Sequence, residues 1–255
     1  MIMKNLFVLL SFCIVIFLGS CLSEENERWS DFSGVYVTVA GDDVQGYRLY
    51  TDFDAVLEPT QESLSQLEWL KEARRVIVGF DMIEETEELK PGQVYSVILK
   101  SAQQIPTFIV GVDTLSVDYQ NGGKDSIALK NEPIRSIEES KGSFYVKNGY
   151  LNLVPTFDYS PVNPVYFLLY YDGVKDIDVV NNKFCLNLYF NNSTESPYGE
   201  ISSFISMEIP YGIYSRFIGA GKEDSDSITC RLNVEAFSGN KEIECKLSLK
   251  DLQLP

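Results

Sequence analysis

The chain has 255 residues, which is enough for one large domain or two modest ones. It carries 37 acidic and 21 basic residues, and a formal net charge of −16 makes nucleic acid and anionic lipid headgroups poor ligands. It contains no histidine, which excludes histidine metal ligands and Ser-His or Cys-His nucleophiles and leaves paired carboxylates as the remaining route to catalysis.

Residues 1–20 have the order of an export signal. Lys4 is followed by an apolar run from Leu6 to Leu18 and then by small residues. The run is shorter than the ~20 residues that a helix needs to cross a hydrocarbon core. We therefore predict a signal peptide over 1–20 and no membrane-spanning helix.

The end of this segment resembles the lipobox of bacterial lipoproteins. It reads Leu18-Gly19-Ser20-Cys21. The resemblance implies cleavage before Cys21 and attachment of diacylglycerol to its thiol, and two or three acyl chains hold a protein firmly on a bilayer. An ordinary signal peptide beside a cysteine is the alternative. The first reading predicts an outer-membrane lipoprotein of the cell envelope.

Residues 21–33 are polar and acidic, which predicts a flexible tether. Acidic residues just after the lipidated cysteine resemble the surface-export signal of lipoproteins in some Gram-negative anaerobes. They equally suit a plain solvated linker. Whether the body faces the exterior or the periplasm stays open.

Residues 34–117 alternate short apolar runs with turn signals. Strands are expected over 35–40, 46–59, 75–83, 93–105 and 106–117. A helix is expected over 61–73, because Pro59-Thr60 offers a start and leucines follow at helical spacing. About five strands and one helix predict a small β-barrel of the OB type.

Residues 118–132 contain paired glycines and no apolar periodicity, which predicts a linker. Residues 133–255 consist almost entirely of short apolar runs between turns. This pattern predicts an antiparallel β-sandwich as the second domain, so the fold class is mainly β.

The last two runs predict a hairpin whose faces alternate strictly between apolar and polar. A turn at Gly239-Asn240 would set Cys230 opposite Leu249, four residues along the ladder from Cys245. That separation is roughly 13 Å, beyond the ~7 Å between Cα atoms that a disulfide spans. Cys185 alternates onto the other face of its strand. We therefore predict three unpaired thiols.

The whole layout resembles the NigD-like family of exported lipoproteins. The likeness rests on Arg75 to Phe80 ("RVIVGF") and Asn148 to Tyr159 ("NGYLNLVPTFDY"), in order with the lipobox and the acidic tether. It implies an OB-type domain followed by a β-sandwich. The family's name implies immunity to a bacteriocin, and it brings no catalytic residues with it.

Two acidic clusters are interpreted as solvated turns. Asp172, Asp176 and Asp178 lie near a glycine but lack the closing Glu of a 12-residue calcium loop. The run from Glu223 to Asp226 lies in a polar loop where no burial would raise a carboxyl pKa. No metal site and no catalytic residue are predicted.

Two further features concern modification and recognition. Asp-Thr/Ser-apolar triplets at Thr114, Ser126 and Ser227 resemble the O-glycosylation signal of some gut anaerobes. Tyrosines in two aromatic stretches offer rings to a sugar or protein partner, although structural roles at the rim of a sandwich suit them better. These tyrosines are Tyr159, Tyr166 and Tyr198.

Three functions follow in order of preference. The first is a non-catalytic binding or protective module of the envelope, similar to a bacteriocin-immunity protein. The second is a surface lipoprotein that captures carbohydrate or protein in uptake or attachment. The third is a hydrolase, which would need two carboxyls about 5–10 Å apart in a concave site. The expected partner is a protein toxin, an envelope protein or a glycan.

Overall fold

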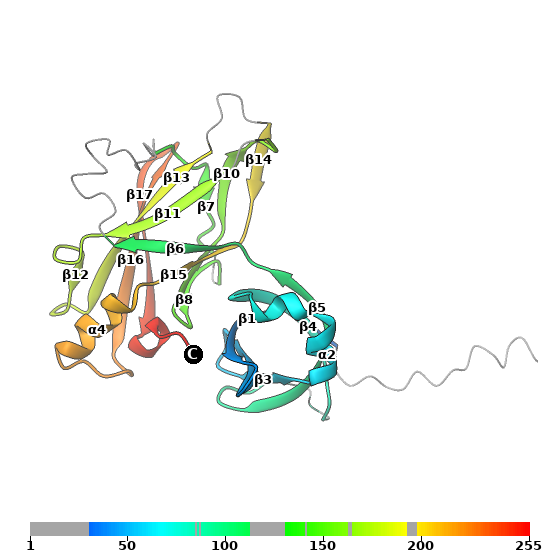
Figure 1. The fold of residues 1–255 in the computed structure, drawn as a ribbon. Helices are drawn as coiled ribbons and strands as arrows, with labels where there is room; N and C mark the ends of the chain where they lie inside the picture. The colour runs from blue at the N-terminus through cyan, green and yellow to red at the C-terminus, as the bar shows by residue number, and fades with distance from the viewer. Residues whose placement is uncertain are drawn as a thin grey trace, which may run out of the picture.

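The computed structural model describes residues 31–84, 86, 88–112, 131–140, 142–162, 165–192 and 198–255. The predicted signal peptide, the lipobox with Cys21, and the candidate glycosylation residues Thr114 and Ser126 lie outside these residues. In the part of the chain described, no helix is both long and apolar enough to cross a membrane. The chain forms two β bodies side by side (Figure 1).

The first body is a closed barrel with the strand order β1-β2-β3-β5-β4. Its strands are β1 (Asp31–Asp42), β2 (Gly46–Thr51), β3 (Val56–Pro59), β4 (Arg75–Met82) and β5 (Val94–Gln104). Alternate residues of the strands, among them Val37, Leu49 and Phe80, fill the interior and are fully buried. A five-stranded barrel is confirmed, although the run predicted as one strand over 46–59 forms two of the five, β2 and β3.

The predicted helix over 61–73 is broken into two short pieces. Helix α2 (Gln61–Gln66) is capped by Thr60, and a 3-10 turn, η1 (Glu68–Lys71), follows. At Leu67 the backbone leaves helical geometry, with φ −126° and ψ 49°. Leu64 and Leu70, on either side of the break, are both buried in the barrel core. One straight helix was therefore the wrong prediction, since the chain bends over the barrel.

Both predicted ends of the barrel need correction. Strand β1 begins at Asp31, and Phe32 stacks on Phe80 with ring centroids 5.3 Å apart, so the tether predicted over 21–33 does not reach its predicted end. Strand β6 (Thr107–Val112), predicted in the barrel, pairs in the other body. Pro106 explains the change, because it has no N–H with which to continue the ladder of β5.

The second body contains a large sheet and a small one. The large sheet has the order β17-β16-β13-β11-β6-β15-β9-β8, with β12 paired to β13. Its strands are β6, β8 (Phe144–Lys147), β9 (Tyr150–Leu153), β11 (Tyr166–Tyr171), β12 (Ile177–Asp178), β13 (Lys183–Asn191), β15 (Ile205–Glu208), β16 (Ser227–Ala236) and β17 (Gly239–Ser248). The small sheet contains β14 (Gly199–Ser202), β10 (Pro155–Tyr159) and β7 (Ser136–Ile137).

The two sheets share one apolar core. Phe157 of the small sheet contacts Phe167 and Phe190 of the large one, with ring centroids 5.0 and 5.3 Å apart. The layering agrees with a sandwich, but the prediction that it is antiparallel was wrong. Strand β6 is parallel to β11 and β15, and β13 is parallel to β16. Long crossovers between these strands make parallel pairing feasible.

The crossover from β15 to β16 contains a helix where only short β runs were predicted. Helix α4 (Tyr211–Gly219) begins directly after Pro210. Ile213 and Phe217, four residues apart on one helical face, are fully buried. A last 3-10 turn, η2 (Leu249–Leu252), starts at a capping box formed by Ser248 and Asp251.

The hairpin of β16 and β17 has a different register from the predicted one. Ala236 pairs with Gly239, so the turn is Phe237-Ser238, and Cys230 lies directly opposite Cys245. The predicted register was wrong by four residues. The prediction of three unpaired thiols is nevertheless confirmed, because Cys185, Cys230 and Cys245 are all free in the structure. An even shift leaves every side chain on the same face, so the apolar alternation alone does not distinguish the two pairings.

Candidate functional site

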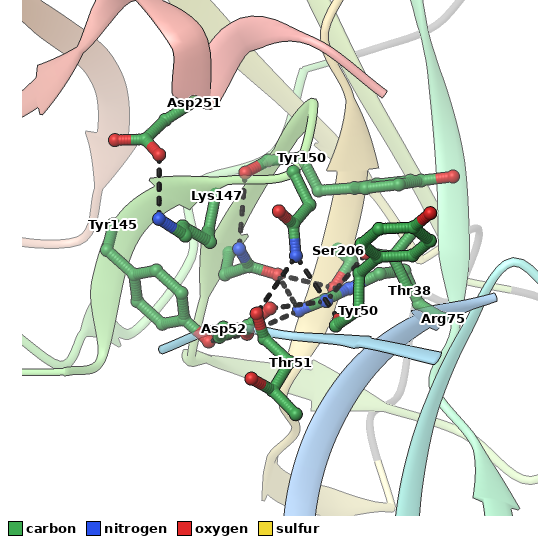
Figure 2. Close-up of polar contacts among 12 residues, drawn as sticks. Thr38, Tyr50, Thr51, Asp52, Arg75, Tyr145, Lys147, Tyr150, Ser206 and Asp251 are labelled. Carbon is green, nitrogen blue, oxygen red and sulfur yellow. Dashed lines mark hydrogen bonds and ion pairs between the residues drawn. The ribbon is translucent and has the colours of Figure 1, made fainter. Parts of the chain in front are cut away.

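The two bodies have separate apolar cores and meet at a polar junction. Arg75, the first residue of β4, lies at the centre of this junction and is fully buried (Figure 2). Strand β9 faces it from the large sheet, and all four residues of β9 are buried. One face of β9 meets the barrel and the other meets the sheet core, which explains why alternation is absent there.

Arg75 is held on several sides by hydrogen bonds. Its two terminal nitrogens contact the carboxylate oxygens of Asp52 at 2.6 and 2.7 Å, a bidentate ion pair. Nη1 also donates to Thr38 Oγ1 at 3.1 Å. From the large sheet, Asn152 Oδ1 accepts from Nη2 at 2.9 Å and Ser206 Oγ accepts from Nε at 3.4 Å. A barrel arginine is therefore solvated by side chains of both bodies.

The charges of this cluster are fixed by their neighbours. Burial acts to lower the pKa of Arg75, but the hydrogen bonds and charge of Asp52 outweigh it and the net shift is upward. The Tyr145 hydroxyl donates to the same carboxylate at 2.5 Å, and burial together with Asp52 raises the pKa of Tyr145. The ring of Tyr150 lies under the guanidinium, 5.5 Å from its carbon. Arg75 therefore stays charged, and the hydroxyl of Tyr145 stays neutral.

A second ion-pair cluster lies beside the first. Lys147 Nζ bonds Asp54 of the barrel and Asp251 of η2, each at 2.8 Å. Burial acts to raise the pKa of Asp54, but the hydrogen bond and charge of Lys147 and the charge of Lys250 outweigh it, so the pKa is lowered. Asn148 donates to two backbone carbonyls of β2 at 3.3 Å. This contact adds the turn between β8 and β9 to the junction, beside strands β8, β9 and β15.

The two segments that carry the NigD-like resemblance meet at this junction. Arg75 opens the first segment, and Asn148 and Asn152 lie in the second. The Arg75–Asn152 hydrogen bond joins them directly across 77 residues of sequence. Sequence reasoning selected these segments but missed this contact. The available signal was an arginine at the head of an apolar strand and an asparagine inside a fully buried one.

A hollow of about 460 Å³ opens on the outer face of β11, β13, β16 and β17, the face turned away from the core. We call it the outer-face hollow. Its lining includes Asn131, Tyr170, Asn187, Tyr189, Asn233, Glu235, Asn240, Lys241 and Glu242. The rings of Tyr170 and Tyr189 are 4.9 Å apart, edge to face. Asn233 Nδ2 donates to Asn187 Oδ1 at 3.0 Å, which orients both amides.

The chemistry of this hollow is that of recognition. Burial raises the pKa of Tyr170 to about 12, so its hydroxyl is neutral and can both donate and accept. Phenol rings, amides and carboxylates bind sugars or polar peptide groups through stacking and hydrogen bonds. None of the sequence-predicted aromatic residues lies here. Buried and half-buried residues alternate along β11 and β13, and Tyr170 and Tyr189 fall on the half-buried face. This alternation was the signal that could have identified the hollow.

The predicted acidic clusters form turns. Asp172 accepts from the backbone of Val174 and Lys175, Asp178 accepts from Asn181, and backbone hydrogen bonds or that amide lower the pKa of both carboxyls. In the loop before β16, Asp226 accepts from the Glu223 N–H. No group of three metal-ligating side chains occurs among the residues that the structure describes.

The predicted tyrosines and the third candidate glycosylation residue belong neither to the polar junction nor to the outer-face hollow. Tyr159 and Tyr198 pack edge to face, 6.2 Å apart, beside the small sheet, and Tyr198 is largely exposed. Tyr166 is also exposed, at the start of β11. Ser227 is exposed at the first position of β16, which leaves its hydroxyl accessible to a modifying enzyme.

This architecture defines a class of β protein in which a small closed barrel is joined to a large mixed sheet. Hydrogen bonds from the buried Arg75 and the Lys147–Asp54 ion pair connect the two bodies. No protein-family model and no curated protein matches the chain. Solved structures match it at the level of fold. The chain is similar to a NigD-like immunity protein from Bacteroides caccae, with 14% identity, a TM-score of 0.52, and coverage of 87% of this chain and 99% of that one.

Two other solved structures share the fold. One is a protein provisionally named as toxin-related from Parabacteroides distasonis, with 13% identity, a TM-score of 0.60, and coverage of 87% of this chain and 96% of that one. The other is an uncharacterised protein from Parabacteroides merdae, with 11% identity, a TM-score of 0.54 and coverage of 86% and 99%. The predicted resemblance to the NigD-like family is confirmed as a likeness of fold that includes both bodies.

Proposed function

We propose that this protein is a non-catalytic, lipid-anchored module of the cell envelope that protects the cell by binding a protein toxin. The observation that carries the proposal is the likeness, over both bodies, to a protein named as NigD-like immunity protein. A protein named as toxin-related shares the same fold. A tethered protein that neutralises a toxin by binding it needs a rigid surface and no reacting group. The polar junction between the two bodies supplies the rigidity.

The charge of the chain supports a basic protein as partner. A net charge of −16 accelerates association with a cationic partner and raises its local concentration. Glu235 lies at the outer-face hollow and places a carboxylate beside its tyrosines, whereas Glu242 is paired with Arg231 at 2.6 Å. Tyrosine is enriched among the residues that dominate binding energy, and a polar rim around it is usual. We therefore assign the outer-face hollow as the binding surface.

The arrangement of carboxylates supports the absence of catalysis. The buried Asp52 is bound by Arg75 and Tyr145, and Asp251 is bound by Lys147. A carboxylate glycosidase needs one carboxyl whose pKa is raised so that it can act as an acid. The pKa of Asp54, the carboxyl between Lys147 and Lys250, is instead lowered.

The proposal is tested by comparing two tyrosine variants in living cells. Cells producing the full chain, Tyr189→Ala or Tyr198→Ala are exposed to culture fluid from toxin-producing neighbours, and survivors are counted. Tyr189 lines the outer-face hollow, whereas Tyr198 is exposed beside the small sheet, so the second variant is a matched control. We expect Tyr189→Ala to lose protection and Tyr198→Ala to keep it. Equal survival of cells with and without the protein, across fluids from many strains, would reject the proposal.

The anchor is tested separately. Cells labelled with radioactive palmitate should yield a labelled wild-type chain and an unlabelled Cys21→Ala chain. Label on the Cys21→Ala chain would show that Cys21 is not the attachment site. Protease treatment of intact cells then shows whether the body faces outward, because only an exposed chain is cut.

The outer-face hollow also supports capture of a glycan as a second candidate function. Its paired rings and fixed amides fit a sugar as well as a peptide. Binding of the purified protein to an array of bacterial and host glycans distinguishes the two functions. A glycan signal that Tyr189→Ala removes favours capture of carbohydrate, and recovery of a protein from cell extracts by the wild type alone favours immunity.

A further inference from the structure

Cys230 and Cys245 are opposite each other on adjacent antiparallel strands. Directly opposed residues have Cα atoms about 4.5–5.5 Å apart. That range falls within the ~4.4–6.8 Å that disulfides span. The two side chains also project on the same face, because Leu232 opposite Ile243 and Ile228 opposite Leu247 continue the same apolar row.

The two thiols differ in access. Cys230 is fully buried in the core, and burial together with the hydrogen bond to Cys245 raises the pKa of its thiol. Cys245 is half-buried and lines a hollow of about 690 Å³ between β17 and β8. We call it the seam hollow, since β17 and β8 are the two edge strands of the large sheet. Its size is that of a site for a small molecule or a peptide loop.

We propose that Cys230 and Cys245 form a cross-strand disulfide, made through the seam hollow by a disulfide-bearing oxidant, either a thiol–disulfide oxidoreductase or a small-molecule disulfide. The Cys245 thiolate attacks the oxidant, forms a mixed disulfide and releases one thiolate. The Cys230 sulfur then attacks Cys245 Sγ, and its proton leaves with the second thiolate. Two protein thiols are oxidised and one oxidant disulfide is reduced to two thiols, so the electrons balance.

Cys185 is excluded from this chemistry by geometry. It pairs in register with Arg231, one position on from the pair formed by Phe184 and Cys230, so it lies on the opposite face of the sheet. Asn233 Nδ2 donates to its sulfur at 3.2 Å. Burial, more than the nearby charges, raises the pKa of Cys185 to about 11, which keeps it as an unreactive thiol. Cys185 therefore serves as the spare cysteine and as an internal control.

The test uses the full chain, folded in native buffer, with oxidised glutathione as the probe. Remaining thiols are alkylated and peptides are identified by mass spectrometry without reduction. We expect a linked Cys230–Cys245 peptide lacking two hydrogens, together with an alkylated Cys185. The Cys185→Ser variant should give the same linked peptide, and Cys245→Ser should leave Cys230 reduced.

Two outcomes would overturn the proposal. One is a stable mixed disulfide of glutathione with Cys245 while Cys230 stays reduced, which would show that the sulfurs do not reach each other. The other is a linked peptide that contains Cys185. Near-ultraviolet circular dichroism confirms that each sample is folded, so neither outcome can arise from misfolding. The chemistry is tested in the purified chain and does not depend on the proposed envelope location or partner.

Discussion

Replacing Arg75 with Met is expected to weaken the coupling between the two bodies strongly. Arg75 is fully buried, and its partner Asp52 is only 12% exposed at the side chain. Methionine fills most of the volume of arginine but leaves the carboxylate buried without a cation. Removing one partner of a buried ion pair costs about 3–5 kcal/mol, whereas removing one partner of an exposed pair costs about 1 kcal/mol or less.

Arg48→Met is the matched control. Arg48 and Glu58 form an ion pair at 2.8 Å on the barrel surface, with side chains 55% and 40% exposed. Urea unfolding followed by both circular dichroism and tyrosine fluorescence should show a small loss for Arg48→Met and a loss about 3 kcal/mol larger for Arg75→Met. The latter transition should also split in two, because each body retains its own apolar core.

A restoring variant separates the ion pair from packing. In Arg75→Met combined with Asp52→Leu, no charge is left unpaired, so much of the lost stability should return. Equal losses for Arg75→Met and Arg48→Met would refute the reasoning, since they would show that the junction charge is solvated. A single unchanged transition in Arg75→Met would show that the two bodies still unfold together and that their coupling does not depend on Arg75.

Three further outcomes are expected. The pKa of Asp54 in the folded protein lies below its ordinary value, so its stabilising contribution is present above about pH 4 and is lost as the pH falls below that. When stability is measured during acid titration, Asp54→Asn should therefore lose less stability in that window than the wild type. Gly149 has φ +78°, and an added Cβ would lie 2.8 Å from the side chain of Leu254, so Gly149→Ala should lower the midpoint of thermal unfolding more than Gly221→Ala, where φ is +81° and the space is open. Phe217→Ala should cost about 3–5 kcal/mol in urea unfolding, because the ring extends from α4 into the core of the second body and is fully buried. A loss below about 1 kcal/mol would show that α4 is not part of that core.

The sequence predicted those parts of the fold that depend on local pattern. Turn signals and β-forming runs identified the barrel, and alternation identified which faces of β16 and β17 are buried. Register was not predictable in the same way, because a shift of four residues leaves those faces unchanged. The helix α4 was missed because only Ile209 and Pro210 separate it from β15, so its apolar residues were interpreted as part of the same strand run.

The site was less predictable than the fold, for a physical reason. The junction is assembled from Arg75, Asp52 and Asn152, which lie far apart in the chain and belong to no local motif. The outer-face hollow depends on the neighbours of β13 in the sheet, and β16 reaches it by a parallel crossover that no short window of sequence encodes. Composition limited which kinds of site were possible, whereas only the strand order shows where the junction and the outer-face hollow lie.

The position of β6 has a consequence for how the chain folds. It is the first strand of the large sheet to be synthesised, yet it lies between β11 and β15, which follow much later. The barrel can close while the rest of the chain is still emerging, but β6 must wait with its hydrogen-bonding edges open until both neighbours arrive. Such non-local parallel pairing is slow and prone to aggregation. Completion of the large sheet is therefore expected to be the slow step of folding, and residues 107–112 are the segment at risk of mispairing during that interval.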